Sequence, residues 1–215
     1  MDDKRRRWFH FRARLFASIR SCVQRHAVVI AMALWVPAVG WGVRAILQYS
    51  NTPGRPATPP THWPHGTGIR FRHGHATLVL FVHPHCPCSK ATLGELASIM
   101  ARPGKVDAYV VFYSPLSEPN GWVRSELWRE AAGITGVQTI EDRAGVEIRR
   151  FGASTSGQTL LYDSGGGLVF NGGITASRGH LGANEGRDSI VAWIDGGKAP
   201  RIPLPVFGCS LLGTD

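Results

Sequence analysis

Seventeen consecutive residues without a charge, Ala27 to Val43, divide this 215-residue chain into two unequal parts. A run of that length approaches the roughly 20 apolar residues that a helix needs to cross a bilayer. Arg44 follows near the end, where its long side chain can reach an interface. A cleaved signal peptide and a buried core helix are the alternatives, but the leader is long for a signal peptide and no clean A-x-A site follows the run. We therefore expect a transmembrane anchor over residues 27–47.

The formal charge of +9 is concentrated in front of this anchor. Residues 1–26 carry eight Lys and Arg side chains against two Asp, a net of +6, so the remainder of the chain carries only +3. A nucleic-acid-binding protein presents its basic groups on a folded face, and this distribution argues against that class. Basic residues beside an apolar segment mark the cytoplasmic side. The sequence thus predicts a single-pass protein of the cell inner membrane, with residues 1–26 as a cytoplasmic tail and its C-terminal domain in the periplasm.

Beyond the anchor, the pattern changes from proline-rich to alternating strands and helices. Five prolines lie within residues 51–66, so we expect residues 48–68 to form an extended, semi-rigid linker that holds the domain away from the membrane. The run Thr77–Val82 predicts a buried strand, and the apolar spacing over Ser89–Met100 predicts a helix. The same reasoning predicts strands at 107–113 and 137–140, helices at 122–132, 144–151 and 188–194, and a hairpin over 159–171. Residues 69–197 should form an α/β domain whose mixed sheet is covered by helices on both faces, and residues 198–215 a tail.

Cysteine placement points to redox chemistry. Cys22 precedes the anchor, which leaves three cysteines beyond it, and an odd number favours at least one thiol that reacts or binds a ligand. If Cys86 caps the helix, Pro87 takes the first helical position, where its missing N–H costs nothing. The Cys86 thiol then faces free amides and the positive end of the helix, which should lower its pKa. Cys88 is the expected resolving thiol, in a small strained ring that favours a catalytic disulfide, and Cys209 in the tail is a candidate redox partner.

Neighbouring basic side chains could assist this centre or bind a metal instead. His83, His85 and Lys90 would favour the thiolate when protonated. Alternatively, thiolates with imidazoles suit copper or zinc, and the alternative metal site comprises His83, His85, Cys86 and Cys88. In the redox interpretation no cofactor is needed.

The segment Phe81-Val-His-Pro-His-Cys86, followed by a helix, resembles the strand-to-active-site segment of the thioredoxin superfamily. The resemblance covers about residues 69–197, and the whole chain looks like membrane-anchored, exported bacterial thioredoxin-like proteins of the RedB type. It implies that Cys86 is the attacking cysteine. The spacing to Cys88 is one residue shorter than the family's Cys-x-x-Cys. The family's cis-proline is missing, and Gln158 falls at that place.

The same resemblance implies an active-site rim formed by the turn at 155–158 and the loop 172–187. Arg178, His180 and Asn184 become candidates for contacts with substrate, although an ordinary glycine-rich connection explains that loop equally well. The expected function is a membrane-tethered thiol–disulfide oxidoreductase with a redox-active centre that exchanges disulfides with exported proteins, small thiols or a membrane redox partner. The alternatives are a copper- or zinc-binding metallochaperone and a binding module without catalysis.

Overall fold

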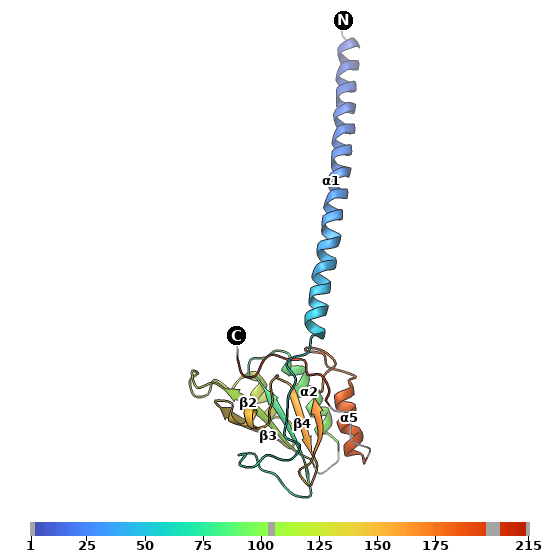
Figure 1. The fold of residues 1–215 in the computed structure, drawn as a ribbon. Helices are drawn as coiled ribbons and strands as arrows, with labels where there is room; N and C mark the ends of the chain where they lie inside the picture. The colour runs from blue at the N-terminus through green and yellow to red at the C-terminus, as the bar shows by residue number, and fades with distance from the viewer. Residues whose placement is uncertain (1–2, 103–105, 197–202, 214–215) are drawn as a thin grey trace. The chain divides into compact units, whose positions relative to one another are not determined.

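The structure is a computed structural model that describes residues 3–102, 106–196 and 203–213, with the side chains of 3–23 and 25 left undescribed. The chain forms two compact units, Met1–Gln48 and Tyr49–Asp215. Helix α1 runs over Asp3–Asn51, and every later helix and strand belongs to the second unit (Figure 1).

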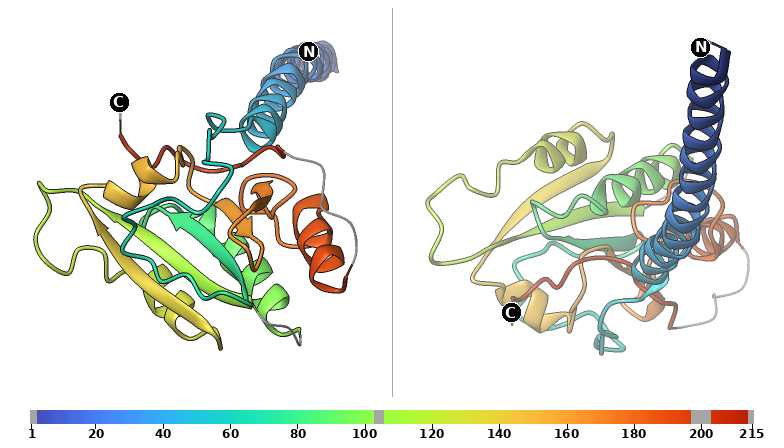
Figure 2. Two further views of the ribbon diagram at one scale, coloured as in Figure 1. Left: turned by 60° about the horizontal axis from the view of Figure 1, so that its bottom comes forward. Right: turned by 90° about the horizontal axis from the view of Figure 1, so that it is seen from above.

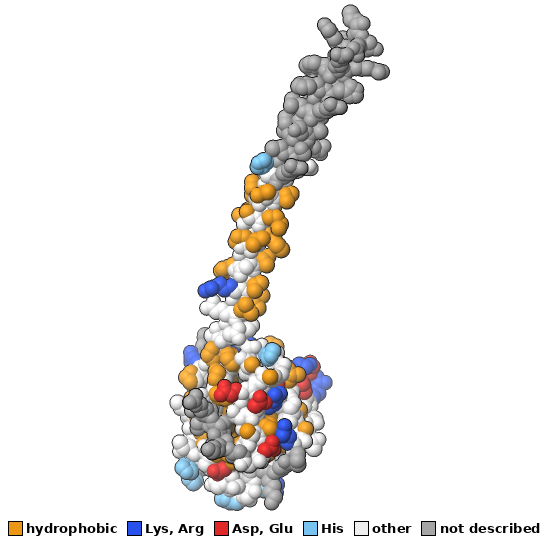
Figure 3. Space-filling model, turned by 90° about the vertical axis from the view of Figure 1, so that its right-hand side faces the viewer, with side chains coloured by type: hydrophobic (Ala, Val, Ile, Leu, Met, Phe, Trp, Pro, Cys, Tyr) orange, Lys and Arg blue, Asp and Glu red, His pale blue; other side chains and the backbone are white. Residues whose placement is uncertain are grey.

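Within helix α1, the segment His26–Asn51 is long and apolar enough to cross a membrane. Its mean hydropathy is 1.7, and no residue of its most apolar stretch is buried. Side chains such as Leu34, Trp35 and Trp41 are exposed on it, and Figure 3 shows apolar side chains along this part of the helix. A soluble core helix would bury such a surface. The segment therefore has the properties of a membrane span or of a signal sequence.

A five-stranded mixed sheet forms the centre of the second unit, in the order β3-β2-β1-β4-β5. Strands β1, β2 and β3 are parallel, whereas β4 runs antiparallel to both β1 and β5. The strand bounds are Ala76–Val82, Val106–Ser114, Val137–Arg143, Gln158–Tyr162 and Leu168–Gly172. All seven residues of β1 are buried because β1 lies in the middle of the sheet with both faces covered.

Two apolar layers cover the two faces of the sheet. Side chains alternate along β1, so that Leu78 and Leu80 face one layer while Val79 and Phe81 face the other. The first layer contains residues from helices α2 (Ser89–Met100), α3 (Glu126–Ala132) and α5 (Glu185–Ile194). Helix α4 (Val146–Arg150) contributes to the second. The predicted mixed α/β sheet with helices on both faces is confirmed.

The proline-rich segment lies against the sheet instead of standing off as a linker. Trp63 contacts the rings of Phe71, Phe151 and Tyr162 at centroid distances of 5.1–5.3 Å. The Trp63 amide also donates to the Gly166 carbonyl at 2.7 Å, and the Tyr162 hydroxyl donates to the Pro60 carbonyl. The prolines do prevent regular structure here. The expected extension away from the domain is wrong, because the aromatic side chain of the segment is part of the second apolar layer.

This packing can be tested by the substitution Trp63→Ala. Removing an indole with three aromatic neighbours should lower the free energy of unfolding by about 3 kcal/mol. Trp41→Ala is a matched control, because Trp41 is 75% exposed on α1. Denaturant unfolding of the full chain in detergent measures both variants. Equal stability of the two would show that the segment is a free tether.

Candidate functional site

The predicted Cys-Pro-Cys segment forms a turn between β1 and α2. Its position after β1 is as expected, but helix α2 begins at Ser89 and its N-cap is Cys88, not Cys86. The Ser89 amide donates to the Cys86 carbonyl at 3.0 Å, which closes a tight turn before the helix. Cys86 therefore lies just outside the helix, two residues before the capping position.

The sulfur of Cys209 lies against that of Cys86. Their Sγ atoms lie 2.8 Å apart, although 123 residues separate them in sequence. Cys86 is only 1% exposed, and no disulfide is formed by the described cysteines, Cys86, Cys88 and Cys209. The structure therefore brings together the first cysteine of the motif and the thiol of the C-terminal segment.

Hydrogen bonds around Cys86 favour its thiolate. The thiol of Cys209 is the strongest influence, and together with weaker hydrogen bonds from the Cys209 backbone, the Ser89 hydroxyl and the Cys88 backbone it outweighs the cost of burial and lowers the pKa of Cys86 to about 4. The same contact raises the pKa of Cys209, because that thiol is the donor when Cys86 is charged. Within the pair, ionisation is therefore favoured on Cys86 over Cys209.

Cys88 lies beside this pair, near Arg178. Burial, followed by the charge of Cys86, raises the pKa of Cys88, and the guanidinium of Arg178 partly opposes both effects. Arg178 also donates to the carbonyls of Gly208 and Tyr49. Of the three rim residues predicted from the sequence, Arg178 thus lies near two of the sulfurs, Cys88 and Cys209.

The other two predicted rim residues have different surroundings. Asn184 is buried and caps helix α5, where its side chain accepts a hydrogen bond from the Arg187 amide at 2.7 Å. His180 is exposed in the preceding loop. The cap shows that Asn184 shapes the loop, which is the structural explanation that the sequence left open.

Two serines that the sequence analysis did not single out connect the centre to the rest of the fold. The Ser156 hydroxyl accepts from the His83 amide at 2.8 Å and lies 2.8 Å from the Ser89 hydroxyl. Both serines are 1% exposed. Ser156 is therefore the residue of the turn 155–158 that contacts the segment around Cys86, through His83 and Ser89. It lies two residues before Gln158, which occupies the place of the family's cis-proline. The only indication of this contact in the sequence is that Ser156 belongs to the turn 155–158, which the family resemblance places at the rim around Cys86.

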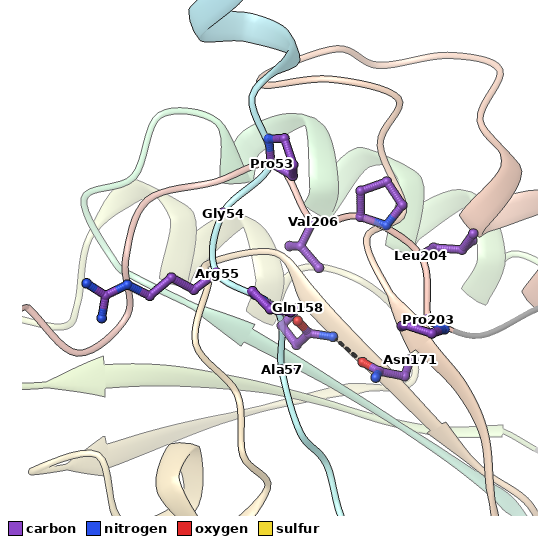
Figure 4. A pocket seen from close by; sticks show the side chains of 11 residues that line it. Pro53, Gly54, Arg55, Ala57, Gln158, Asn171, Pro203, Leu204 and Val206 are labelled. Atoms are coloured by element: carbon purple, nitrogen blue, oxygen red, sulfur yellow. Dashed lines mark hydrogen bonds between the residues drawn. The ribbon is translucent and has the colours of Figure 1, made fainter.

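The side chain of Gln158 points away from this network. Its amide nitrogen donates to Asn171 at 2.6 Å in a separate pocket of about 230 Å³, between residues 53–57 and 203–206 (Figure 4). Among the described atoms, its Oε1 has no hydrogen-bond partner. The side chain of Gln158, at the place of the family's cis-proline, therefore extends toward β5.

Trp122 is the common neighbour of the two histidines of the motif. The ring of His85 lies 4.5 Å from that of Trp122, and the ring of His83 lies 5.8 Å from it. Burial lowers the pKa of His83, only partly offset by the charge of Cys86. Within residues 3–102, 106–196 and 203–213, no group of three or more His, Cys, Asp or Glu side chains is arranged to hold a metal. The four ligands of the alternative copper or zinc site therefore do not converge.

A surface pocket of about 290 Å³ reaches the active segment from the side of α3. Lys90 lies at this pocket and pairs with Glu126 at 3.1 Å, so its charge is directed to that carboxylate and not to the sulfur. Pro87 lines the same pocket and is exposed. Cys86 is among the residues that line this pocket, and none of the lining residues belongs to the C-terminal segment.

Comparisons with known proteins place the fold but give no function. No family model matches the chain, and no curated protein matches it. An uncharacterized conserved protein from Geobacillus kaustophilus is similar in structure, with TM-score 0.56 and 21% identity over 76% of this chain and 93% of its own. A hypothetical protein, SMc02350 from Sinorhizobium meliloti 1021, gives TM-score 0.54 and 19% identity over 76% and 95%.

The strand order, with three parallel strands, an antiparallel hairpin and a cysteine between the central strand and its following helix, completes the arrangement that the sequence resemblance implied. The fold is thioredoxin-like. A secreted disulfide oxidoreductase from Mycobacterium tuberculosis is a more distant neighbour, with TM-score 0.41 and 14% identity over 58% of this chain and 83% of its own. In this thioredoxin-like domain the Cys-Pro-Cys segment lies where β1 ends.

The ionisation of Cys86 yields a direct prediction. Alkylation of Cys86 in the reduced protein, followed by peptide mass mapping, should be nearly independent of pH above neutrality and fall as the pH approaches about 4. Ser89→Ala removes a donor to the thiolate and should raise this pKa by about one unit. Ser98→Ala, in the same helix but bonded to the Gly94 carbonyl, should leave it unchanged. An ordinary thiol titration of Cys86 would contradict the site described above.

Proposed function

We propose that this chain is a membrane-tethered thiol–disulfide oxidoreductase of the periplasmic side, in which Cys86 exchanges disulfides with exported proteins or small thiols. One observation carries the proposal: Cys86 follows the central strand with its sulfur 2.8 Å from a second thiol and surrounded by hydrogen-bond donors. Thiolate, not thiol, attacks a disulfide. Thiol–disulfide exchange needs at least an ionised thiol and a second sulfur within reach of it.

The surroundings of the centre suit an exchange reaction better than a structural disulfide. Cys86 is among the residues that line a surface pocket, a position that a purely structural bridge does not require. The pocket combines apolar and polar side chains: Pro84, His85, Cys86, Pro87, Lys90, Ser125, Glu126 and Leu127. Such a lining fits an extended, partly apolar stretch of polypeptide next to a cysteine, which favours protein disulfides as the substrate class.

Location follows from the charge distribution and the apolar helix. The eight basic residues of the first 26 favour a cytoplasmic N-terminus, and the span at 26–51 would then place the domain outside the cytoplasm. Disulfides persist in that compartment. The enzyme would act there on exported proteins or accept electrons from a redox protein of the same membrane.

Loss of the attacking thiol tests the activity. Cys86→Ser in the full chain should abolish reduction of a protein disulfide such as that of insulin in the presence of dithiothreitol, because serine is not a competent nucleophile at this centre. Cys22→Ser is the matched control and should retain the wild-type rate, since Cys22 precedes the membrane span. Full activity of Cys86→Ser would overturn the proposed function.

The tether is tested separately from the chemistry. The full-length chain should stay in the membrane pellet after alkaline carbonate extraction and keep its original N-terminus, because an uncleaved apolar helix is inserted in the bilayer. A variant that begins at Tyr49 should be recovered in solution. Recovery of a soluble periplasmic chain cleaved after the apolar run would show that the helix is a signal sequence.

A further inference from the structure

The C-terminal segment, residues 203–213, is held in register beside the active-site turn. The Ser156 amide donates to the Cys209 carbonyl at 2.8 Å, and the Leu211 amide donates to the Ser154 carbonyl at 3.0 Å. These bonds form a short antiparallel bridge in which Thr155 faces Ser210. The turn that contacts the active segment through Ser156 therefore also fixes the position of Cys209.

Further contacts on both sides of Cys209 fix the path of the segment. The Leu204 amide donates to the Asn171 carbonyl, and the Gly54 amide donates to the Val206 carbonyl; Figure 2 shows the C-terminal segment passing along the N-terminal part of the folded unit. Leu211 is fully buried. A segment anchored before and after a cysteine holds that sulfur in a defined place, as a catalytic group requires.

Glycine at position 208 lets the C-terminal segment pass close to the backbone of Ser156. A Cβ atom at this position would lie 1.9 Å from the Ser156 carbonyl oxygen, far inside van der Waals contact. The neighbouring carbonyl of Gly208 accepts from the Arg178 guanidinium. Gly208 thus packs against the turn that contains Ser156 on one side. On the other side it binds Arg178, whose guanidinium is near Cys88 and Cys209.

We propose that Cys209, and not Cys88, is the resolving thiol of this centre, so that the oxidised enzyme contains a Cys86–Cys209 disulfide. The inference rests on the proposed function and assigns its second cysteine. The side chains of both Cys88 and Cys209 interact with Cys86. Cys209 lies 2.8 Å from the Cys86 sulfur and comes from a different segment, so it can bond to that sulfur without closing a strained ring. Cys88 lies two residues from Cys86, so a bridge between them spans a single proline.

The reaction is balanced by the two thiols and a substrate disulfide. The Cys86 thiolate attacks one sulfur of the substrate, a Cys86–substrate bond forms, and the first substrate thiolate leaves. Cys209 then loses its proton to that thiolate or to water, and its sulfur attacks Sγ of Cys86. The mixed disulfide breaks and the second substrate thiolate leaves. The substrate has gained two electrons and the Cys86–Cys209 pair has lost two; the reverse sequence oxidises a substrate dithiol.

The charge distribution gives these steps an order. While Cys86 is a thiolate, its charge keeps the pKa of Cys209 raised, so Cys209 stays protonated and donates its hydrogen bond. Formation of the mixed disulfide removes that charge. Cys209 then ionises more readily, next to the sulfur that it must attack, with Arg178 nearby to favour the new thiolate.

Single-turnover trapping with oxidised glutathione tests the assignment in the full chain. After reduction, the Cys209→Ser variant should retain a glutathione adduct on Cys86, with at least about a tenfold slower loss of that adduct than the wild type. Cys88→Ser should clear the adduct at a rate within about twofold of the wild type and yield a Cys86–Cys209 peptide pair. Cys22→Ser is the control for the substitution itself.

Peptide mapping of the oxidised wild-type chain keeps the test independent of how any variant folds. A Cys86–Cys209 pair is expected. A Cys86–Cys88 pair, or trapping by Cys88→Ser while Cys209→Ser clears normally, would overturn the inference and leave the oxidoreductase function standing. No adduct on Cys86 in any variant would instead count against the proposed function, and with it the inference.

Discussion

The sulfur–sulfur contact between Cys86 and Cys209 is the interaction on which the site depends. It supplies the largest favourable contribution to the ionisation of Cys86, and it joins the segment after β1 to a segment 123 residues later. A thiol is a weak hydrogen-bond donor in water. Here both sulfurs are partly withdrawn from solvent, where the same bond is stronger. The tertiary contact thus replaces the cationic neighbours that usually activate a cysteine.

Backbone hydrogen bonds provide most of the interactions that hold the two sulfurs together. The backbone of the turn at 154–157 forms hydrogen bonds with the C-terminal segment. The Ser156 hydroxyl of the same turn accepts a hydrogen bond from the His83 amide, next to the Cys-Pro-Cys segment. Gly157 also donates to the Phe81 carbonyl, at the end of β1. One turn therefore fixes both sulfurs relative to the central strand. A change in this turn would move the two thiols apart without touching either cysteine.

Local patterns in the sequence predicted the elements that form the sheet and its helices. The apolar run before Cys86 is a central strand because it is buried on both faces, and the helix from Ser89 to Met100 follows the predicted periodicity. The residue that caps this helix is Cys88 and not Cys86, because the chain from Cys86 to Ser89 first forms a tight turn.

The long-range contacts could not be predicted in the same way. Cys209 was only a candidate partner, because its place depends on backbone bonds to residues 154 and 156, and backbone groups are the same in every sequence. Trp63 was assigned to a linker because its prolines dominated the local pattern, whereas its aromatic neighbours come from Phe151 and Tyr162. In both cases the position of the residue depends on a partner that is distant in sequence, which no local pattern encodes.

Electrophoretic mobility of the oxidised, denatured chain measures the central claim most directly. A Cys86–Cys209 disulfide closes a loop of more than a hundred residues and keeps the denatured chain compact, so the oxidised protein should migrate faster without reductant than with it. A Cys86–Cys88 disulfide closes a loop too small to alter the chain's dimensions. Equal mobility of a fully oxidised chain and its reduced form would contradict the account.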